Sequence, residues 1–234
     1  MSDTDIVEVM VFGDSITYGA WDNNGGWVQK LREPMDVKNL VDSSVAYFVY
    51  NLGVVDDTSA GIVKRFEHEV AARRYLNEVQ KRVAIFCVGL NDSEIILKKK
   101  TNRVPPEEFE HNVNELIRMA REHVDKIIFV GPTPVDETLA EPVPWDTEKA
   151  YRNSVIKKYN NIVKSICKGE KIDFIEIFDV VIRLDYKSLL EDGLHPSPTG
   201  HFVIYELIRG YLEKNKILNF NATKSLEHRY KEDK

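Results

Sequence analysis

Five short apolar runs recur along the chain, and they are rich in the β-branched and aromatic residues that fit the pleated surface of a sheet. The first four stop within two residues of a glycine, where the backbone can leave an extended path. The runs are nearly continuous rather than strictly alternating, which favours strands that are buried on both faces. The predicted strands span residues 7–12, 45–51, 82–88, 126–130 and 172–177.

Stretches with apolar positions at helical spacing separate these strands. Asp57, Thr58 and Ser59 supply capping side chains ahead of one stretch, and Ser197 with Pro198 opens the last. The predicted helices span about 27–32, 60–80, 106–120, 147–168 and 198–212. Alternation of buried strands with helices is typical of an α/β fold, in which helices cover both faces of a parallel sheet.

The segment between the fourth strand and the fourth helix differs from the rest. Residues 132–145 contain four prolines and little periodicity, which predicts a long, stiffened surface loop of the kind that often acts as a lid. No internal repeat or linker divides the chain, so we expect one domain over residues 1–215. Residues 216–234 are charged and are expected to form a C-terminal extension that frays or packs loosely.

Composition narrows the classes of partner. With 43% hydrophobic and 30% charged residues, the 234-residue chain has the make-up of an ordinary globular protein. Its net charge of −6 comes from intermixed charges of both signs, which argues against a nucleic-acid surface. The short basic run at 98–100 is expected to be a solvated loop. Composition therefore argues against a nucleic-acid partner, and the oligomeric state stays open.

The sequence shows no targeting signal, membrane span or metal site. The acidic residues near the amino terminus lack the pattern of a secretory signal, and no apolar stretch approaches the roughly 20 residues of a membrane span, so a cytoplasmic protein is expected. Cys87 and Cys167 are too few for a disulfide framework and are expected to be buried free thiols. No cluster of histidines and carboxylates has the spacing of metal ligands.

Candidate chemistry gathers where the strands end. The carboxyl ends of parallel strands lie on one edge of a sheet, which is where ligands bind in such folds. Ser15 follows the first strand, and Asp192 and His195 follow the fifth. A hydroxyl, an imidazole and a carboxylate are the parts that nucleophilic catalysis needs at neutral pH. Candidate donors for an oxyanion are the Ser15 amide, the Gly53 amide and the Asn91 side chain.

These segments carry a family resemblance. Residues 12–15 (Phe-Gly-Asp-Ser), Gly53, 89–92 (Gly-Leu-Asn-Asp) and 192–196 (Asp-Gly-Leu-His-Pro) resemble the four sequence blocks of the SGNH, or GDSL-type, hydrolases, in the family's order. The resemblance implies a flavodoxin-like, three-layer α/β/α sandwich with a five-stranded parallel sheet. It implies Ser15 as nucleophile, His195 as base with Asp192 as its partner, and an oxyanion hole from Ser15, Gly53 and Asn91.

The resemblance also implies the activity. Family members are esterases, lipases, thioesterases and carbohydrate acetylesterases that need no cofactor. We expect a serine esterase that forms an acyl-enzyme and acts on a short-chain or carbohydrate acetyl ester. The alternatives are a lysophospholipase or thioesterase of the same family, or a non-catalytic flavodoxin-like binding protein. One departure is visible: residues 54–59 replace the smaller, more glycine-rich segment that many relatives have after the glycine, which leaves the substrate subgroup open.

Aromatic side chains near the candidate nucleophile are the candidates for substrate contact. Tyr18, Trp21 and Trp27 follow the first strand, and Trp145 ends the proline-rich loop. Aromatic rings of this kind line an alcohol or acyl pocket or serve plain packing, and the sequence alone does not separate the two roles.

Overall fold

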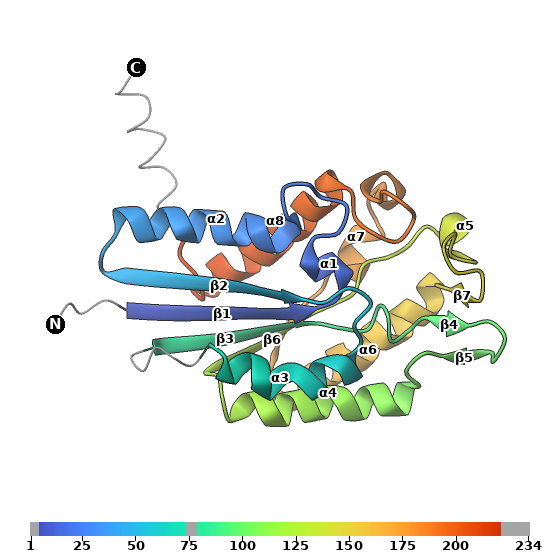
Figure 1. Cartoon of the computed structure of the whole chain (residues 1–234), viewed down its shortest axis with the longest axis horizontal. Helices are drawn as coiled ribbons and strands as arrows, with labels where there is room; N and C mark the ends of the chain where they lie inside the picture. The colour runs from blue at the N-terminus through green and yellow to red at the C-terminus, as the bar shows by residue number, and fades with distance from the viewer. Residues whose placement is uncertain (1–4, 74–78, 221–234) are drawn as a thin grey trace, which may run out of the picture.

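The structure is a computed structural model that describes residues 5–73 and 79–220. Its centre is a five-stranded sheet in the order β2-β1-β3-β6-β8, and all of its strand pairs are parallel (Figure 1). The predicted fold class, a parallel α/β fold flanked by helices, is confirmed. The strands are β1 (Asp5–Gly13), β2 (Val45–Gly53), β3 (Val79–Cys87), β6 (Lys126–Val130) and β8 (Asp173–Ile175).

Helices cover both faces of the sheet and enclose two apolar cores. In β1, Val9 and Val11 belong to one core, and Met10 and Phe12 belong to the other, because successive side chains of a strand point to opposite faces. This explains why the strand lacks polar alternation. One face carries α2 (Gly26–Val41), α7 (Phe178–Val181) and α8 (Pro198–Lys214), and the other carries α3 (Ser59–Ala71), α4 (Pro106–Arg121) and α6 (Asn153–Glu170).

Two predicted helices were wrong in length. Helix α2 continues through Pro34 to Val41, because Met35 beyond the proline is fully buried in the core and holds the helix in place. Helix α3 ends at Ala71 rather than near residue 80. Residues 74–78 of that prediction lie outside the described residues, and Val79 already belongs to β3.

The start of α6 was also predicted too early. The Asp146 carboxylate accepts the Glu148 N–H at 3.1 Å, so it closes a local turn and does not cap a helix. The next residues form β7 (Lys149–Ala150), which pairs antiparallel with β4 (Ile95–Ile96). Together with β5 (Thr101–Asn102), they form a small second sheet that the sequence analysis missed.

The proline-rich segment is anchored rather than loose. It contains the short helix α5 (Glu137–Ala140), and Val135, Ala140 and Val143 are almost fully buried in the core. Only part of the segment is therefore a surface loop. Trp145, at its end, is 56% exposed.

The segment after α8 begins with apolar residues. Ile217, Leu218 and Phe220 are buried against the core that contains β1, so residues 217–220 do not pack loosely, as the sequence analysis expected. Residues 221–234 of the predicted extension lie outside the described residues. The domain boundary at residue 215 stays a prediction. Among the described helices, none has both the length and the apolar composition that crossing a membrane requires.

Candidate active site

The turn after β1 presents Ser15 at the carboxyl edge of the sheet. Asp14 caps the short helix α1 (Ser15–Tyr18), and its carboxylate accepts the Ile16 N–H at 2.9 Å. Gly13 is required there, because a Cβ at this position would lie 2.2 Å from Thr17 Oγ1. Burial raises the pKa of Asp14 to about 6. Strand β1, Gly13 and the Asp14 cap together fix the position of the Ser15 backbone.

The loop before α8 brings His195 to this hydroxyl. Ser15 Oγ lies 3.0 Å from His195 Nε2, and His195 Nδ1 lies 2.8 Å from Asp192 Oδ2. Because a carboxylate oxygen only accepts, Nδ1 carries the ring proton and Nε2 is free to accept from Ser15. The three residues predicted as nucleophile, base and partner thus lie in one hydrogen-bonded chain.

Asp192 is held by its own loop. Its Oδ1 accepts the backbone N–H groups of Leu194 at 3.0 Å and His195 at 2.7 Å. Gly193, at φ +88°, makes this tight turn possible. Burial alone would raise the pKa of Asp192, but the hydrogen bonds from the His195 side chain and the two amides hold it well below its usual range. The carboxylate therefore stays ionised beside the imidazole.

Asn91 has a fixed orientation beside Ser15. Its Nδ2 donates to the Asp57 carbonyl at 2.9 Å, and its Oδ1 accepts the Tyr151 hydroxyl at 2.9 Å. These partners decide which end of the amide is which, because a carbonyl cannot donate. Asn91 lines a hollow together with Ser15 and His195, and its amide carries a second hydrogen.

The Gly53 amide, the third candidate oxyanion donor, already has a hydrogen-bond partner. Its N–H donates to Asn51 Oδ1 at 3.0 Å, and a Cβ added to it would lie 2.2 Å from the Tyr18 nitrogen. Glycine here lets β2 pass close to the backbone of α1. Neither of the two hollows that contain Ser15 is lined by Gly53.

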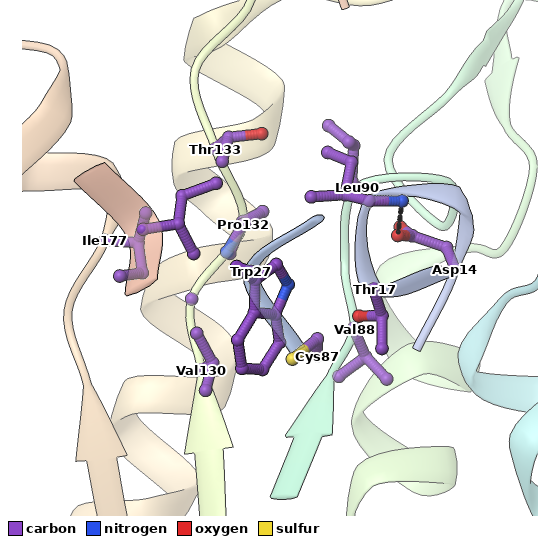
Figure 2. A pocket seen from close by; sticks show the side chains of 13 residues that line it. Asp14, Thr17, Trp27, Cys87, Val88, Leu90, Val130, Pro132, Thr133 and Ile177 are labelled. Carbon is purple, nitrogen blue, oxygen red and sulfur yellow. Dashed lines mark hydrogen bonds between the residues drawn. The ribbon is translucent and has the colours of Figure 1, made fainter. Parts of the chain in front are cut away.

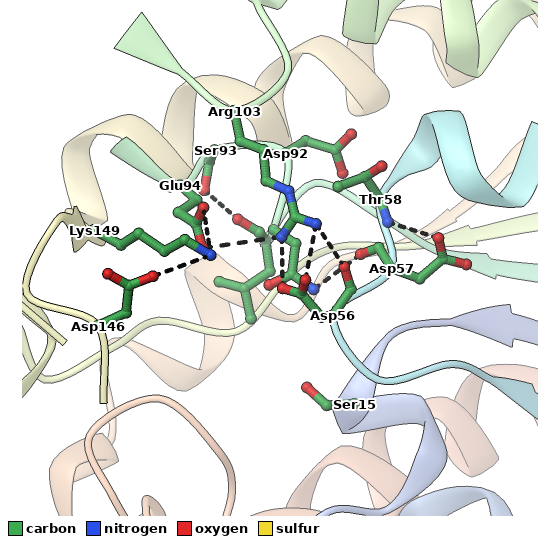
Figure 3. Close-up of polar contacts among 12 residues, drawn as sticks. Ser15, Asp56, Asp57, Thr58, Asp92, Ser93, Glu94, Arg103, Asp146 and Lys149 are labelled. Atoms are coloured by element: carbon green, nitrogen blue, oxygen red, sulfur yellow. Dashed lines mark hydrogen bonds and ion pairs between the residues drawn. The ribbon is translucent and has the colours of Figure 1, made fainter. Parts of the chain in front are cut away.

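Asp56 lines the hollow beside Ser15, and the sequence analysis did not single it out. Its φ is +65°, in a turn closed by a hydrogen bond from the Asp57 N–H to the Val54 carbonyl at 3.1 Å. Arg103 clamps Asp56 by donating to its Oδ1 at 2.6 Å, its Oδ2 at 2.9 Å and its carbonyl at 3.0 Å (Figure 3). Aspartate is enriched among the residues that adopt positive φ, so the residue type is the signal that could have indicated this turn.

We call this recess the charged hollow; it is lined by Ser15 and His195 together with Asp56, Asn91, Glu94, Lys149 and Tyr151. Figure 3 shows Asp56, Glu94 and Lys149 of this group, with Ser15. Lys149 Nζ lies 3.5 Å from a carboxylate oxygen of Glu94. Burial raises the pKa of Glu94. Tyr151 connects this buried acid to Asn91, because its hydroxyl also lies 3.1 Å from Glu94 Oε2. The sequence analysis missed Glu94, Lys149 and Tyr151, since Lys149 and Tyr151 were placed in a predicted helix.

A second recess, the aromatic hollow, adjoins the charged hollow, and Ser15, Val55, Trp145 and His195 line both. Tyr18, Trp21, Val55 and Trp145 line it, together with Ser15 and His195. Three of the four aromatic candidates for substrate contact therefore lie together. Trp27 does not join them: it is buried and lines a separate cavity beneath the α1 turn, with Asp14, Thr17 and Cys87 (Figure 2).

The two cysteines and Asp92 lie among groups that give them structural roles. Cys87 and Cys167 are free thiols, of which Cys167 is buried and Cys87 partly so. Asp92 accepts the Ser59 N–H at 3.0 Å and the Gly89 N–H at 3.1 Å, so it connects the loop after β3 to the start of α3. Within residues 5–73 and 79–220, no group of three or more histidine, cysteine or carboxylate side chains is placed to hold a metal ion.

Comparisons with known proteins identify the family. Residues 11–202 match the model of the GDSL-like lipase/acylhydrolase family. The isoamyl acetate-hydrolyzing esterase 1 homolog of Homo sapiens is 25% identical over 216 residues, covering 88% of this chain and 81% of that protein. The isoamyl acetate-hydrolyzing esterase of Saccharomyces cerevisiae is 21% identical over 220 residues, covering 89% and 87%.

Solved structures share the fold. The lipase/acylhydrolase from Enterococcus faecalis has a TM-score of 0.65 at 22% identity, covering 89% of this chain and 96% of that chain. Axe2, an acetylxylan esterase from Geobacillus stearothermophilus, has a TM-score of 0.65 at 19% identity, covering 94% and 98%.

The close approach of β2 to α1 predicts the effect of a single methyl group. Gly53→Ala should lower the free energy of unfolding by about 2 kcal/mol, because its Cβ meets backbone atoms that cannot turn aside. Gly210→Ala in α8 is the matched control, since no heavy atom lies within 4 Å of its Cβ, and it should be neutral or stabilising by about 0.5–1 kcal/mol. Chemical denaturation measures both, and equal midpoints would contradict this account.

Proposed function

The chain belongs to the GDSL-like lipase/acylhydrolase family and is an esterase or acylhydrolase of that family, and we propose that Ser15, His195 and Asp192 form its catalytic triad. The observation that carries the proposal is the chain of contacts from Ser15 Oγ to His195 Nε2 at 3.0 Å and from His195 Nδ1 to Asp192 Oδ2 at 2.8 Å. A neutral imidazole whose other nitrogen is bound by a carboxylate is the arrangement that activates a serine hydroxyl.

The reaction then has two halves. Ser15 Oγ attacks the ester carbonyl carbon while His195 Nε2 takes its proton, and the tetrahedral intermediate collapses as His195 returns that proton to the leaving alcohol. Water next loses a proton to His195 and attacks the acyl-enzyme, and Ser15 leaves with the proton restored. Asp192 holds the ring and stabilises its charged form throughout, which its depressed pKa supports.

The oxyanion needs donors that are already in place, each worth about 3 kcal/mol of barrier. We propose the Ser15 amide, at the start of α1, and the Asn91 side chain as two of them. The support for Asn91 is that Asp57 and Tyr151 fix its orientation beside Ser15. The third predicted donor, the Gly53 amide, already donates to Asn51, and the Asp56 amide in the charged hollow is a competing candidate.

The substrate we propose is a short-chain or carbohydrate acetyl ester. Two relatives are named for isoamyl acetate hydrolysis, and a protein of the same fold is an acetylxylan esterase. The aromatic hollow, with Tyr18, Trp21 and Trp145, offers flat apolar faces that suit either a branched alkyl alcohol or a sugar ring. We assign these three side chains to contact with the substrate.

Removal of the nucleophile tests the triad. Ser15→Ala should lower kcat/KM for p-nitrophenyl acetate at least about 1,000-fold, because the other groups cannot form an acyl-enzyme without the hydroxyl. The thermal midpoint of the variant should match that of the wild type, which would show that the fold survives. Turnover at the wild-type rate in a folded variant would refute the assignment.

A substrate series tests the proposed ester class. Rates for p-nitrophenyl esters from acetyl to palmitoyl should fall as the acyl chain lengthens. Isoamyl acetate and acetylated xylose serve as acetyl esters of two natural alcohols. A maximum at long acyl chains would favour the lysophospholipase reading, and preference for an acyl thioester would favour the thioesterase. Binding of these esters without turnover of any would favour a non-catalytic binding protein.

A further inference from the structure

Trp21 does more than line the aromatic hollow. Its indole Nε1–H donates to Asp192 Oδ2 at 2.6 Å, and the same oxygen accepts the His195 Nδ1–H at 2.8 Å. We propose that Trp21 is a positioning residue of the triad, which holds Asp192 in the plane of the imidazole and limits how strongly that carboxylate holds the proton of His195. This inference rests on the triad proposed above.

With Trp21 included, the Asp192 carboxylate receives four hydrogen bonds. Two backbone amides of its own loop donate to Oδ1, and the imidazole and the indole donate to Oδ2. Trp21 is the one of these donors that comes from outside the 192–195 loop, since it lies 171 positions away along the chain. It therefore connects the nucleophile's side of the site, which follows β1, directly to the carboxylate on the histidine's side.

The backbone of Trp21 has an unusual, left-handed conformation where the indole makes this contact. Its φ is +66°, a region that costs a bulky side chain of order 1 kcal/mol or more and persists only where the surroundings impose it. On one side, the Ala20 carbonyl lies 3.0 Å from Nε2 of the buried His201 in α8. On the other, the buried Asp22 carboxylate accepts Lys30 Nζ of α2 at 2.8 Å. Both neighbours are thus anchored to helices while the indole extends to Asp192.

Trp145 provides a matched comparison within the same hollow. Its ring lies 5.9 Å from that of His195, against 5.4 Å for Trp21, and the two tryptophans are 56% and 58% exposed. Among the hydrogen bonds of the described residues, none involves the Trp145 indole. Replacement of either ring by phenylalanine therefore removes a similar amount of apolar surface, but only the change at Trp21 removes a proton donor from the triad.

Loss of the indole donor should shift the pH dependence of activity in a predictable direction. Without the indole, the charge on Asp192 Oδ2 is concentrated on the imidazole N–H, so protonated His195 is held more tightly. The neutral form that takes the proton of Ser15 then becomes available only at higher pH. Titratable groups near His195 include Asp14, whose pKa burial raises to about 6, and His201, whose pKa burial lowers. Others line the same two hollows as His195: Tyr18, Asp22, Asp56, Glu94, Lys149 and Tyr151. All of them remain in either variant.

The experiment compares Trp21→Phe with Trp145→Phe over about pH 5 to 9, where a histidine base titrates. Trp21→Phe should lower kcat for p-nitrophenyl acetate about 10-fold, as expected for the loss of a hydrogen bond to a charged group. It should also move the acid limb of the kcat/KM profile to higher pH by about half a pH unit. Trp145→Phe should raise KM and leave that limb in place. An unmoved limb in Trp21→Phe, with only a change in KM, would overturn the positioning role.

Two further measurements separate the causes of failure. If Trp21→Phe does not fold, Asp192→Asn can be compared with the wild type instead: the indole N–H resonance of Trp21 should shift more than that of Trp145. Equal shifts would overturn the proposal. If Ser15→Ala retains turnover, the triad itself is wrong. If Ser15 is essential and the acid limb of Trp21→Phe stays in place, only the role of Trp21 is wrong.

Discussion

The hydrogen bond between Ser15 Oγ and His195 Nε2 joins two parts of the chain that lie 180 positions apart, and the rest of the site depends on it. The parallel sheet makes it possible, because the carboxyl ends of β1 and β8 lie on the same edge. The strands are fixed in register by two apolar cores, so the turn that carries Ser15 and the loop that carries His195 approach each other from rigid supports. The packing that stabilises the two cores therefore also fixes the geometry of the site.

Around that bond, buried polar groups hold the loops in place. Asp14 caps the turn of the serine, Asp92 connects the loop of Asn91 to α3, and Asp22 accepts Lys30 beneath Trp21. An unpaired buried carboxylate would be costly, and each of these accepts hydrogen bonds. The charged hollow extends the pattern, since Arg103 clamps Asp56 where the backbone takes a positive φ. Polar contacts fix the position of groups that a purely apolar core would leave free.

Much of this could be predicted from local sequence. The apolar runs predicted the five strands, and the places of Ser15, Asp192 and His195 after strands predicted that these side chains lie on one edge of the parallel sheet. Their roles were implied by the family resemblance. Contacts set by tertiary packing could not be predicted. Tyr151 reaches Asn91 only because Lys149 and Ala150 pair with β4, and the indole of Trp21 reaches Asp192 only because its neighbours are anchored to α2 and α8. Periodicity carries no record of such pairings, which is also why α6 was predicted to start too early.

The central claim is that His195 activates Ser15 across this edge of the sheet. A fluorophosphonate reacts covalently with an activated serine, so its rate of attachment measures that activation directly, and peptide mapping by mass spectrometry locates it. The account predicts one adduct on Ser15 in the wild type, and labelling slowed about 100-fold or more in a folded His195→Ala variant. Labelling at another residue, or an unchanged rate in His195→Ala, would contradict it.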